Sequence, residues 1–201
     1  QPGAAHIAHL AADIRLVSSA VRFLEFPALA STSSSTDSAE HPAMAVLSAA
    51  WPTLSAFNAA PWRGVPAVVE ALCEVYTRAL LCAKMAAAPL LPHLLEALRD
   101  IFVAHTAHSA CCLDTLASAV EVFSTGSGGG GGALGVMAPA AVSHIPDAAV
   151  ADAFAQTLLA VAQAAHGALT SAPSMADRAE TARATFELAQ RFALFAPQQL
   201  L

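Results

Sequence analysis

Apolar side chains recur at intervals of three and four residues along most of the chain, the period of an amphipathic α-helix. The pattern is clearest at positions 66–86, where Val68, Leu72, Tyr76 and Ala79 fall on one face. The strict alternation that is typical of β-strands is missing. The pattern predicts helices at 7–26, 42–58, 66–86, 88–104, 109–123, 146–169 and 174–195.

Two tracts that are poor in apolar residues interrupt this pattern. The Ser-rich tract 31–38 predicts a linker, and the Gly-rich tract 125–135 predicts a disordered insertion, because Gly loses the most conformational freedom on ordering. The remaining helices pair in chain order into units 42–86, 88–123 and 146–195. The first two units start about 46 residues apart, within the period of HEAT and armadillo repeats. We therefore predict a single all-α array over residues 1–201, an α-α superhelix (HEAT/armadillo-type solenoid) of about seven helices.

The composition agrees with helix and argues against several classes of partner. Ala and Leu are strong helix formers, and both are abundant among the 56 % of residues that are hydrophobic. A net charge of −6 with a single lysine, Lys84, argues against nucleic-acid binding, because phosphate neutralisation needs clustered cations. The most apolar windows are 79–95, which Lys84 and two prolines interrupt, and 158–169, which is too short to cross a bilayer. We predict no membrane insertion.

The start of the chain and its cysteines indicate a piece of an intracellular protein. The chain begins at Gln1 rather than at methionine, and no basic segment followed by an apolar run marks a signal peptide. The predicted helix 7–26 would then be the second half of a repeat cut by the chain start. Four sparsely placed cysteines do not resemble a secreted disulfide framework, so we expect free thiols.

Short segments of the chain share their order and spacing with a known family. They are His41-Pro42, Trp51-Pro52-Thr53-Leu54-Ser55, Val68-Val69-Glu70, Leu90-Leu91-Pro92-His93-Leu94 and Thr185-Phe186-Glu187-Leu188-Ala189-Gln190-Arg191-Phe192. Together they resemble the C-terminal part of the transportin-SR and importin-13 group of importin-β (karyopherin-β) nuclear transport receptors. The resemblance implies a HEAT-repeat protein that shuttles between cytoplasm and nucleus, carrying protein cargo past nuclear pore proteins. It also implies control by a Ran-type GTPase that binds N-terminal repeats absent from this chain.

One departure from the family concerns cargo. In transportin-SR an arginine-rich helix, which aligns with 68–83, reads phosphorylated Arg-Ser cargo. The family's arginines are replaced here by Ala71, Glu74, Thr77 and Leu81. Only Arg78 is basic nearby, and Glu74 would repel the phosphate oxygens that guanidinium groups recognise. We therefore do not extend the phospho-cargo specificity to this chain, and an importin-13-like or divergent cargo choice stays open.

Five residues are candidates for contact with a partner: Trp62, Arg63, Glu70, Glu74 and Arg78. Trp62 and Arg63 could offer an aromatic ring and a cation, although a tryptophan packed between repeats is the simpler interpretation. The carboxylates of Glu70, Glu74, Glu96, Asp100, Asp114 and Glu121 could line one face and take basic cargo segments. The alternative is a solvated outer face. In the last unit we place Phe154, Phe186, Phe192 and Phe195 in the core, and Arg183, Glu187 and Arg191 in an exposed charge ladder.

One group of residues has the composition of a metal or thiol site. His105, His108 and Cys111 with Cys112 could present three ligands, but zinc prefers four ligands, usually as two separated pairs. A reactive cysteine needs an electropositive, accessible site, and cations are scarce. We predict no catalytic residue, no metal and no cofactor. Two alternatives remain: a generic α-solenoid interaction scaffold without a transport role, and a small helical metal or thiol enzyme built on His105, His108 and Cys111.

Overall fold

The computed structural model describes residues 3–24, 41–125 and 148–197, and within these ranges all regular secondary structure is helical. The α-helices are α1 (Ala4–Arg22), α2 (Pro42–Phe57), α3 (Pro66–Ala83), α4 (Leu91–Ala104), α5 (Ala110–Thr125), α6 (Ala148–Thr170) and α7 (Ala179–Phe195). The all-α prediction is confirmed, and the helix bounds lie within a few residues of those predicted. The Ser-rich tract 31–38 and residues 126–135 of the Gly-rich tract lie outside the described residues, whereas Thr125 ends α5.

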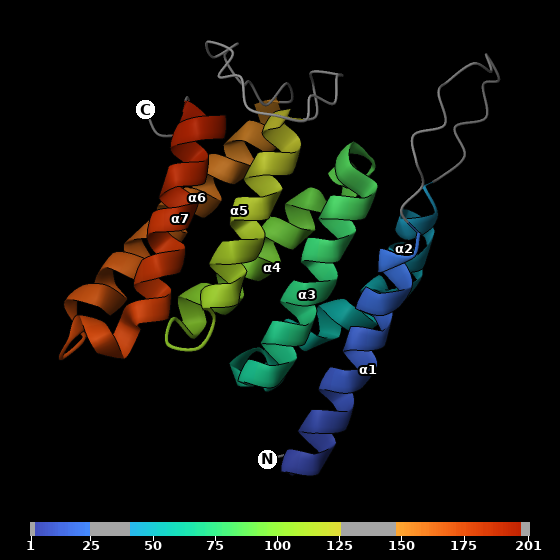
Figure 1. Ribbon diagram of the computed structural model, residues 1–201, viewed down its shortest axis with the longest axis horizontal. Helices are drawn as coiled ribbons and strands as arrows, with labels where there is room; N and C mark the ends of the chain where they lie inside the picture. The colour runs from blue at the N-terminus through green and yellow to red at the C-terminus, as the bar shows by residue number, and fades with distance from the viewer. Residues whose placement is uncertain (1–2, 25–40, 126–147, 198–201) are drawn as a thin grey trace.

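The helices form two rows, which Figure 1 shows one behind the other. Helices α1, α3, α5 and α7 lie side by side in chain order in the first row, and each packs on the next. Helices α2, α4 and α6 make up the second row, in which α4 packs on α6. Each second-row helix also contacts the first-row helix that follows it in the chain, α2 with α3, α4 with α5 and α6 with α7. The most extensive packing therefore joins helices that are next but one along the chain.

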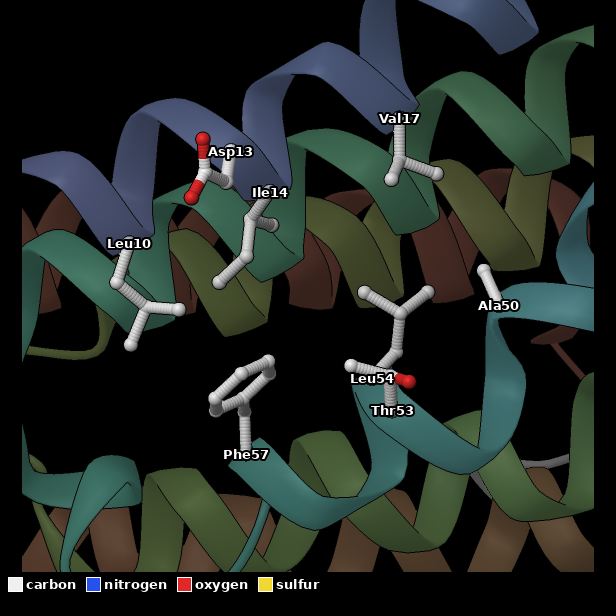
Figure 2. Close-up of a pocket in the computed structure, with 8 residues that line it drawn as sticks. All are labelled: Leu10, Asp13, Ile14, Val17, Ala50, Thr53, Leu54 and Phe57. Atoms are coloured by element: carbon white, nitrogen blue, oxygen red, sulfur yellow. The ribbon is translucent and has the colours of Figure 1, made fainter.

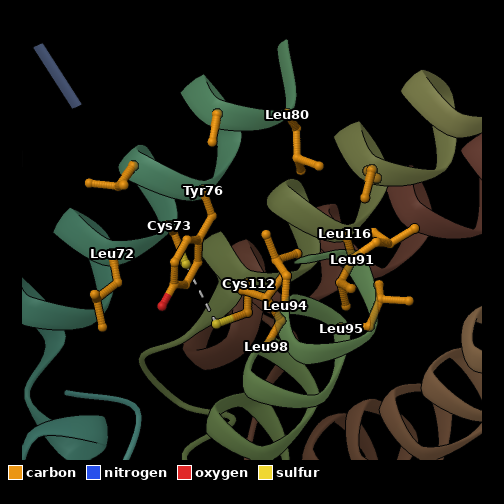
Figure 3. Close-up of a cluster of buried hydrophobic side chains, with 14 of the residues drawn as sticks. Leu72, Cys73, Tyr76, Leu80, Leu91, Leu94, Leu95, Leu98, Cys112 and Leu116 are labelled. Carbon is orange, nitrogen blue, oxygen red and sulfur yellow. Dashed lines mark hydrogen bonds between the residues drawn. The ribbon is translucent and has the colours of Figure 1, made fainter. Parts of the chain in front are cut away.

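Helix α3 buries ten of its eighteen residues. It begins with Pro66 at its first turn, where a missing backbone N–H costs nothing. It ends at Lys84, which adopts a φ of 49°, a left-handed conformation that an α-helix cannot continue. The predicted inward face is confirmed by buried side chains that include Val68, Leu72, Tyr76 and Leu80 (Figure 3).

The two rows meet around Tyr76, whose ring is buried among the leucines of α3 and α4 (Figure 3). Its hydroxyl donates a hydrogen bond to Oδ1 of Asn58, 3.1 Å away, at the end of α2. The ring of Trp51 lies 5.9 Å from the Tyr76 ring and 6.4 Å from that of His93, so it joins α2 to both α3 and α4. Burying aromatic rings contributes strongly to the stability of such a core.

Two stretches are long and apolar enough to cross a membrane by length and composition alone, Pro66–Ala104 and Ala148–Thr170. The first is not one helix: it contains α3, a 3₁₀ segment η2 (Lys84–Leu90) and α4. The second is α6, which buries Phe154 and Val161 against neighbouring helices. In both stretches an apolar face packs within the helical core.

The last helix pair, α6 and α7, corrects the prediction that four of its phenylalanines lie in the core. Phe154 and Phe192 are buried, with their rings edge to face and 6.2 Å between centroids, and Phe195 is half-buried. Phe186, in contrast, is 70 % exposed. The buried face of α7 includes Leu188 and Phe192, which are four residues apart on one side of the helix, and Phe186 lies off that side.

Candidate protein-binding groove

An open groove runs between α3 and α5 in the first row and has a volume of about 410 Å³. It is lined by Glu70, Cys73, Glu74, Thr77, Arg78 and Leu81 of α3 and by Cys111, Asp114 and Thr115 of α5. Three of the five residues predicted to contact a partner, Glu70, Glu74 and Arg78, therefore lie in one surface. We call this surface the α3/α5 groove.

The carboxylates on the α3 side of the groove are engaged by α1. Arg15 places its Nε atom 3.4 Å from Oε2 of Glu74 and its Nη2 atom 4.0 Å from Oε2 of Glu70. Ser18, which is buried, donates from its hydroxyl to Oε1 of Glu74 over 3.2 Å. A basic partner would have to compete with these contacts for the carboxylate of Glu74.

The carboxylate on the α5 side is engaged by α7. Arg183 donates from Nη2 to Oδ2 of Asp114 over 2.9 Å, and it also pairs with Glu180 and Glu187 on its own helix. The hydrogen bonds that Arg183 donates to Asp114 and then to Glu180 raise its pKa, so the guanidinium stays charged. Arg191 likewise pairs with Glu121 of α5. The predicted ladder of Arg183, Glu187 and Arg191 is confirmed, but it is not merely solvated, because two of its arginines join α7 to α5.

Arg78 differs from the other groove charges. It is half-buried and forms no salt bridge with any residue that the structure describes. Leu81 lies one turn further along α3 and is 44 % exposed. An unpaired arginine beside an exposed leucine suits a partner that brings a carboxylate and an apolar side chain, and arginine is enriched among the residues that dominate binding energy.

Trp62 and Arg63, the other two candidates, lie outside the groove lining. They belong to a 3₁₀ turn, η1 (Trp62–Gly64), which precedes α3. The half-buried Trp62 ring packs edge-on against Phe57 at 5.9 Å and lies 6.1 Å from the ring of His6. The structure thus favours the interpretation of Trp62 as a packing residue between helices.

The six predicted acidic residues do not share one face. Glu96 and Asp100 line a separate pocket of about 220 Å³, together with Trp51 and His93 of the second row. Glu70, Glu74 and Asp114 line the first-row groove instead. The expectation of one acidic face is wrong, because α4 and α5 belong to different rows and their carboxylates point to different surfaces.

Three cysteines meet at the base of the α3/α5 groove. The Sγ atoms of Cys73 on α3 and Cys112 on α5 are 3.7 Å apart (Figure 3). With Cys111 they form a group whose three sulfurs all lie within 4.8 Å of one another. Cys73 and Cys112 are buried, whereas Cys111 is half-buried and faces the groove. All are free thiols, as expected from the sequence.

The pKa values of the three thiols differ. Hydrogen bonds from Cys112 and Cys73 lower the pKa of Cys111 to about 4. The hydrogen bond with Cys111, together with burial, raises the pKa of Cys73 and of Cys112. Of the three thiols, Cys111 therefore loses its proton most readily.

The structure groups Cys73, Cys111 and Cys112, and not the set of His105, His108 and Cys111 that was considered from the sequence. Among the described residues, the sulfurs group with one another and not with His105 or His108. His105 instead caps the end of α4, and its ring lies against Gly64. Sequence reasoning missed Cys73, which is far away in the chain. The available signal was that Cys73 falls on the predicted inward face of its helix.

A second, more apolar pocket of about 360 Å³ lies between α1 and α2 (Figure 2). Leu10, Ile14 and Val17 of α1 face Leu54 and Phe57 of α2 across it. Asp13 and Thr53 add polar atoms at its edge. Its size is within the range of small-molecule pockets.

No family model, no curated protein and no solved structure matches this chain. The likeness to importin-β receptors therefore rests on the short sequence segments described above.

Proposed function

We propose that this chain is an α-solenoid segment of an importin-β-type nuclear transport receptor, which binds protein cargo during nucleocytoplasmic import. One observation supports the solenoid: the helices lie in two rows in chain order, and each row helix packs on its neighbours in the row. Stacked helix pairs of this kind bury a continuous core and leave long surfaces for other proteins. The segment would act in the cytoplasm and the nucleus and would contact nuclear pore proteins.

The α3/α5 groove is the surface that we assign to cargo. It lies on α3, the helix that aligns with the cargo-reading helix of transportin-SR, although here only Arg78 remains basic. Arg78, which pairs with no carboxylate in the part of the chain that the structure describes, and the exposed Leu81 favour a protein segment with a carboxylate and an apolar side chain over one with phosphoserines.

The groove assignment is tested with the immobilised chain and a cell extract. Variants Arg78→Glu and Leu81→Asp are compared with Arg22→Glu on α1 and Leu159→Asp on α6, two exposed positions outside the groove lining. We expect the groove variants to lose at least about tenfold in the captured amount of each specific partner, in line with the loss of an interface anchor. Equal losses in the control variants would overturn the assignment.

The transport assignment is tested with a receptor that carries this segment and the N-terminal repeats. A GTP-locked Ran-type GTPase should release the captured cargo, and immobilised nuclear pore proteins should retain the receptor. Cargo that depends on the groove but is indifferent to the GTPase would contradict an import role. That outcome would leave the alternative function, a solenoid scaffold without transport.

A further inference from the structure

We propose that Cys73, Cys111 and Cys112 form a binding site for a thiophilic d¹⁰ cation, Zn²⁺ or Cu⁺, at the base of the α3/α5 groove. The three sulfurs come from two helices that pack side by side, and they all lie within 4.8 Å of one another. This site does not depend on the transport role and would exist in a scaffold protein as well.

The spacing of the sulfurs fits coordination. Thiolates bound to one zinc ion at about 2.3 Å in tetrahedral geometry lie roughly 3.8 Å from each other. The Cys73 and Cys112 sulfurs are already 3.7 Å apart. The Cys111 sulfur lies within 4.8 Å of the other two, so it needs to approach them by at most about 1 Å to reach this spacing.

The kind of donor selects the kind of cation. The group contains three sulfurs and, among the residues that the structure describes, no histidine nitrogen or carboxylate oxygen. Soft thiolate donors select zinc and Cu⁺ over hard cations such as Mg²⁺ or Ca²⁺. Three sulfurs complete the coordination of Cu⁺, whereas zinc would keep a fourth position for water or for a donor from a partner in the groove.

Access and proton balance agree with this assignment. Cys111 lines the open groove and so provides the route by which the cation reaches the two buried sulfurs. Binding one cation displaces the protons that the thiols hold and forms three metal–sulfur bonds, without any oxidation or reduction.

Thr115 lies beside the sulfur group and joins its two helices. Its hydroxyl lies 3.0 Å from the backbone carbonyl oxygen of Cys111 and 3.5 Å from that of Cys73. It is also 3.0 Å from the hydroxyl of Thr77 on α3. These contacts link α3 and α5 at the level of the three sulfurs.

The test uses the purified chain, reduced and kept free of oxygen. Co²⁺ serves as an optical probe in place of Zn²⁺, and its displacement by Zn²⁺ gives the affinity for zinc. Competition with a chromogenic Cu⁺ chelator gives the affinity for Cu⁺. We expect one cation per chain, an intense sulfur-to-cobalt absorption band, and release of protons on binding. The proposal would be overturned if neither Zn²⁺ nor Cu⁺ bound to the chain in a one-to-one ratio.

Variants locate the site. Cys111→Ser should weaken binding by at least about tenfold, whereas Cys82→Ser should not, because Cys82 lies outside the sulfur group and contacts the carbonyl of Val21. Circular dichroism checks that each variant is folded. As a measurement that needs no variant, bound metal should protect Cys111, the accessible thiol of the group, from alkylation while Cys82 keeps its rate. Unchanged binding in Cys111→Ser, or protection of Cys82 alone, would contradict the assignment.

Discussion

Arg183 of α7 holds Asp114 of α5 through two hydrogen bonds from one nitrogen, 2.9 and 3.2 Å long. The same guanidinium reaches Glu180 and Glu187 on its own helix. A single exposed side chain thus links two neighbouring helices of the first row and fixes one wall of the α3/α5 groove.

We predict that Asp114→Asn lowers the free energy of unfolding by about 0.2–1 kcal/mol, because both partners are well exposed and water screens the pair. The loss should shrink in 1 M salt, where the screening length is only about 3 Å. Urea denaturation at low and high salt measures both effects. Asp152→Asn, on the exposed side of α6, is the matched control and should change little. A loss that is indifferent to salt would contradict the ion-pair interpretation.

Two phenylalanines of α7 should behave in opposite ways. Phe192→Ala removes a buried ring that meets Phe154 edge to face, and we expect it to cost about 3–5 kcal/mol of stability. Phe186→Ala should stay within about 0.5 kcal/mol of the parent, because that ring is mostly exposed. Thermal unfolding of the two variants compares them directly, and similar losses would show that α7 is rotated differently.

Gly64 is a position where the packing requires the absence of a side chain. A Cβ atom there would lie 3.0 Å from Cε1 and 3.2 Å from Nε2 of the His105 ring. We expect Gly64→Ala to cost about 1 kcal/mol or more, since overpacking displaces a half-buried ring.

Combining Gly64→Ala with His105→Ala relieves the contact. The double variant should therefore be more stable than the sum of the single effects predicts, by at least about 0.5 kcal/mol in urea unfolding. Strict additivity of the two substitutions would show that the ring and the glycine do not touch.

The pH dependence of alkylation tests whether the pKa of Cys111 is lowered. A thiol of ordinary pKa, about 8.5, reacts roughly tenfold faster for each pH unit gained between pH 6 and 8, because the thiolate is the nucleophile. Cys111, with its pKa lowered to about 4, is already ionised throughout this range. Its rate with iodoacetamide should therefore change less than about twofold, and Cys111→Ser should abolish that phase. A tenfold rise per unit, as in a reference cysteine peptide, would contradict the thiolate assignment.

The helices could be predicted because burial follows their period. The residues of α4 spaced by three and four, such as Leu91, Leu94, Leu98 and Phe102, are buried. At the start of the last predicted helix, Asp177 accepts a hydrogen bond from the backbone N–H of Ser174. The helix starts were less accurate, because 3₁₀ turns precede α4 and α7.

The candidate sites could be predicted only in part, because they depend on how helices far apart in sequence turn toward one another. The pattern placed Glu74 and Cys73 on α3. It could not show that Arg15 would pair with Glu74, or that Cys112 would lie beside Cys73. Phe186 was misplaced for a related reason: an aromatic residue is counted as core by its size, whereas the rotation of α7 decides its exposure.

The order of the helices in the first row also determines how readily each helix unfolds locally. Within the described chain, α3 and α5 each have a row neighbour on both sides, while α1 and α7 have one on a single side. An outer helix can detach by breaking one such contact surface, but a central helix must break two. Amide hydrogens of α3 and α5 should consequently exchange with solvent more slowly than those of α1 and α7, so the sulfur group lies in the part of the fold that opens least often.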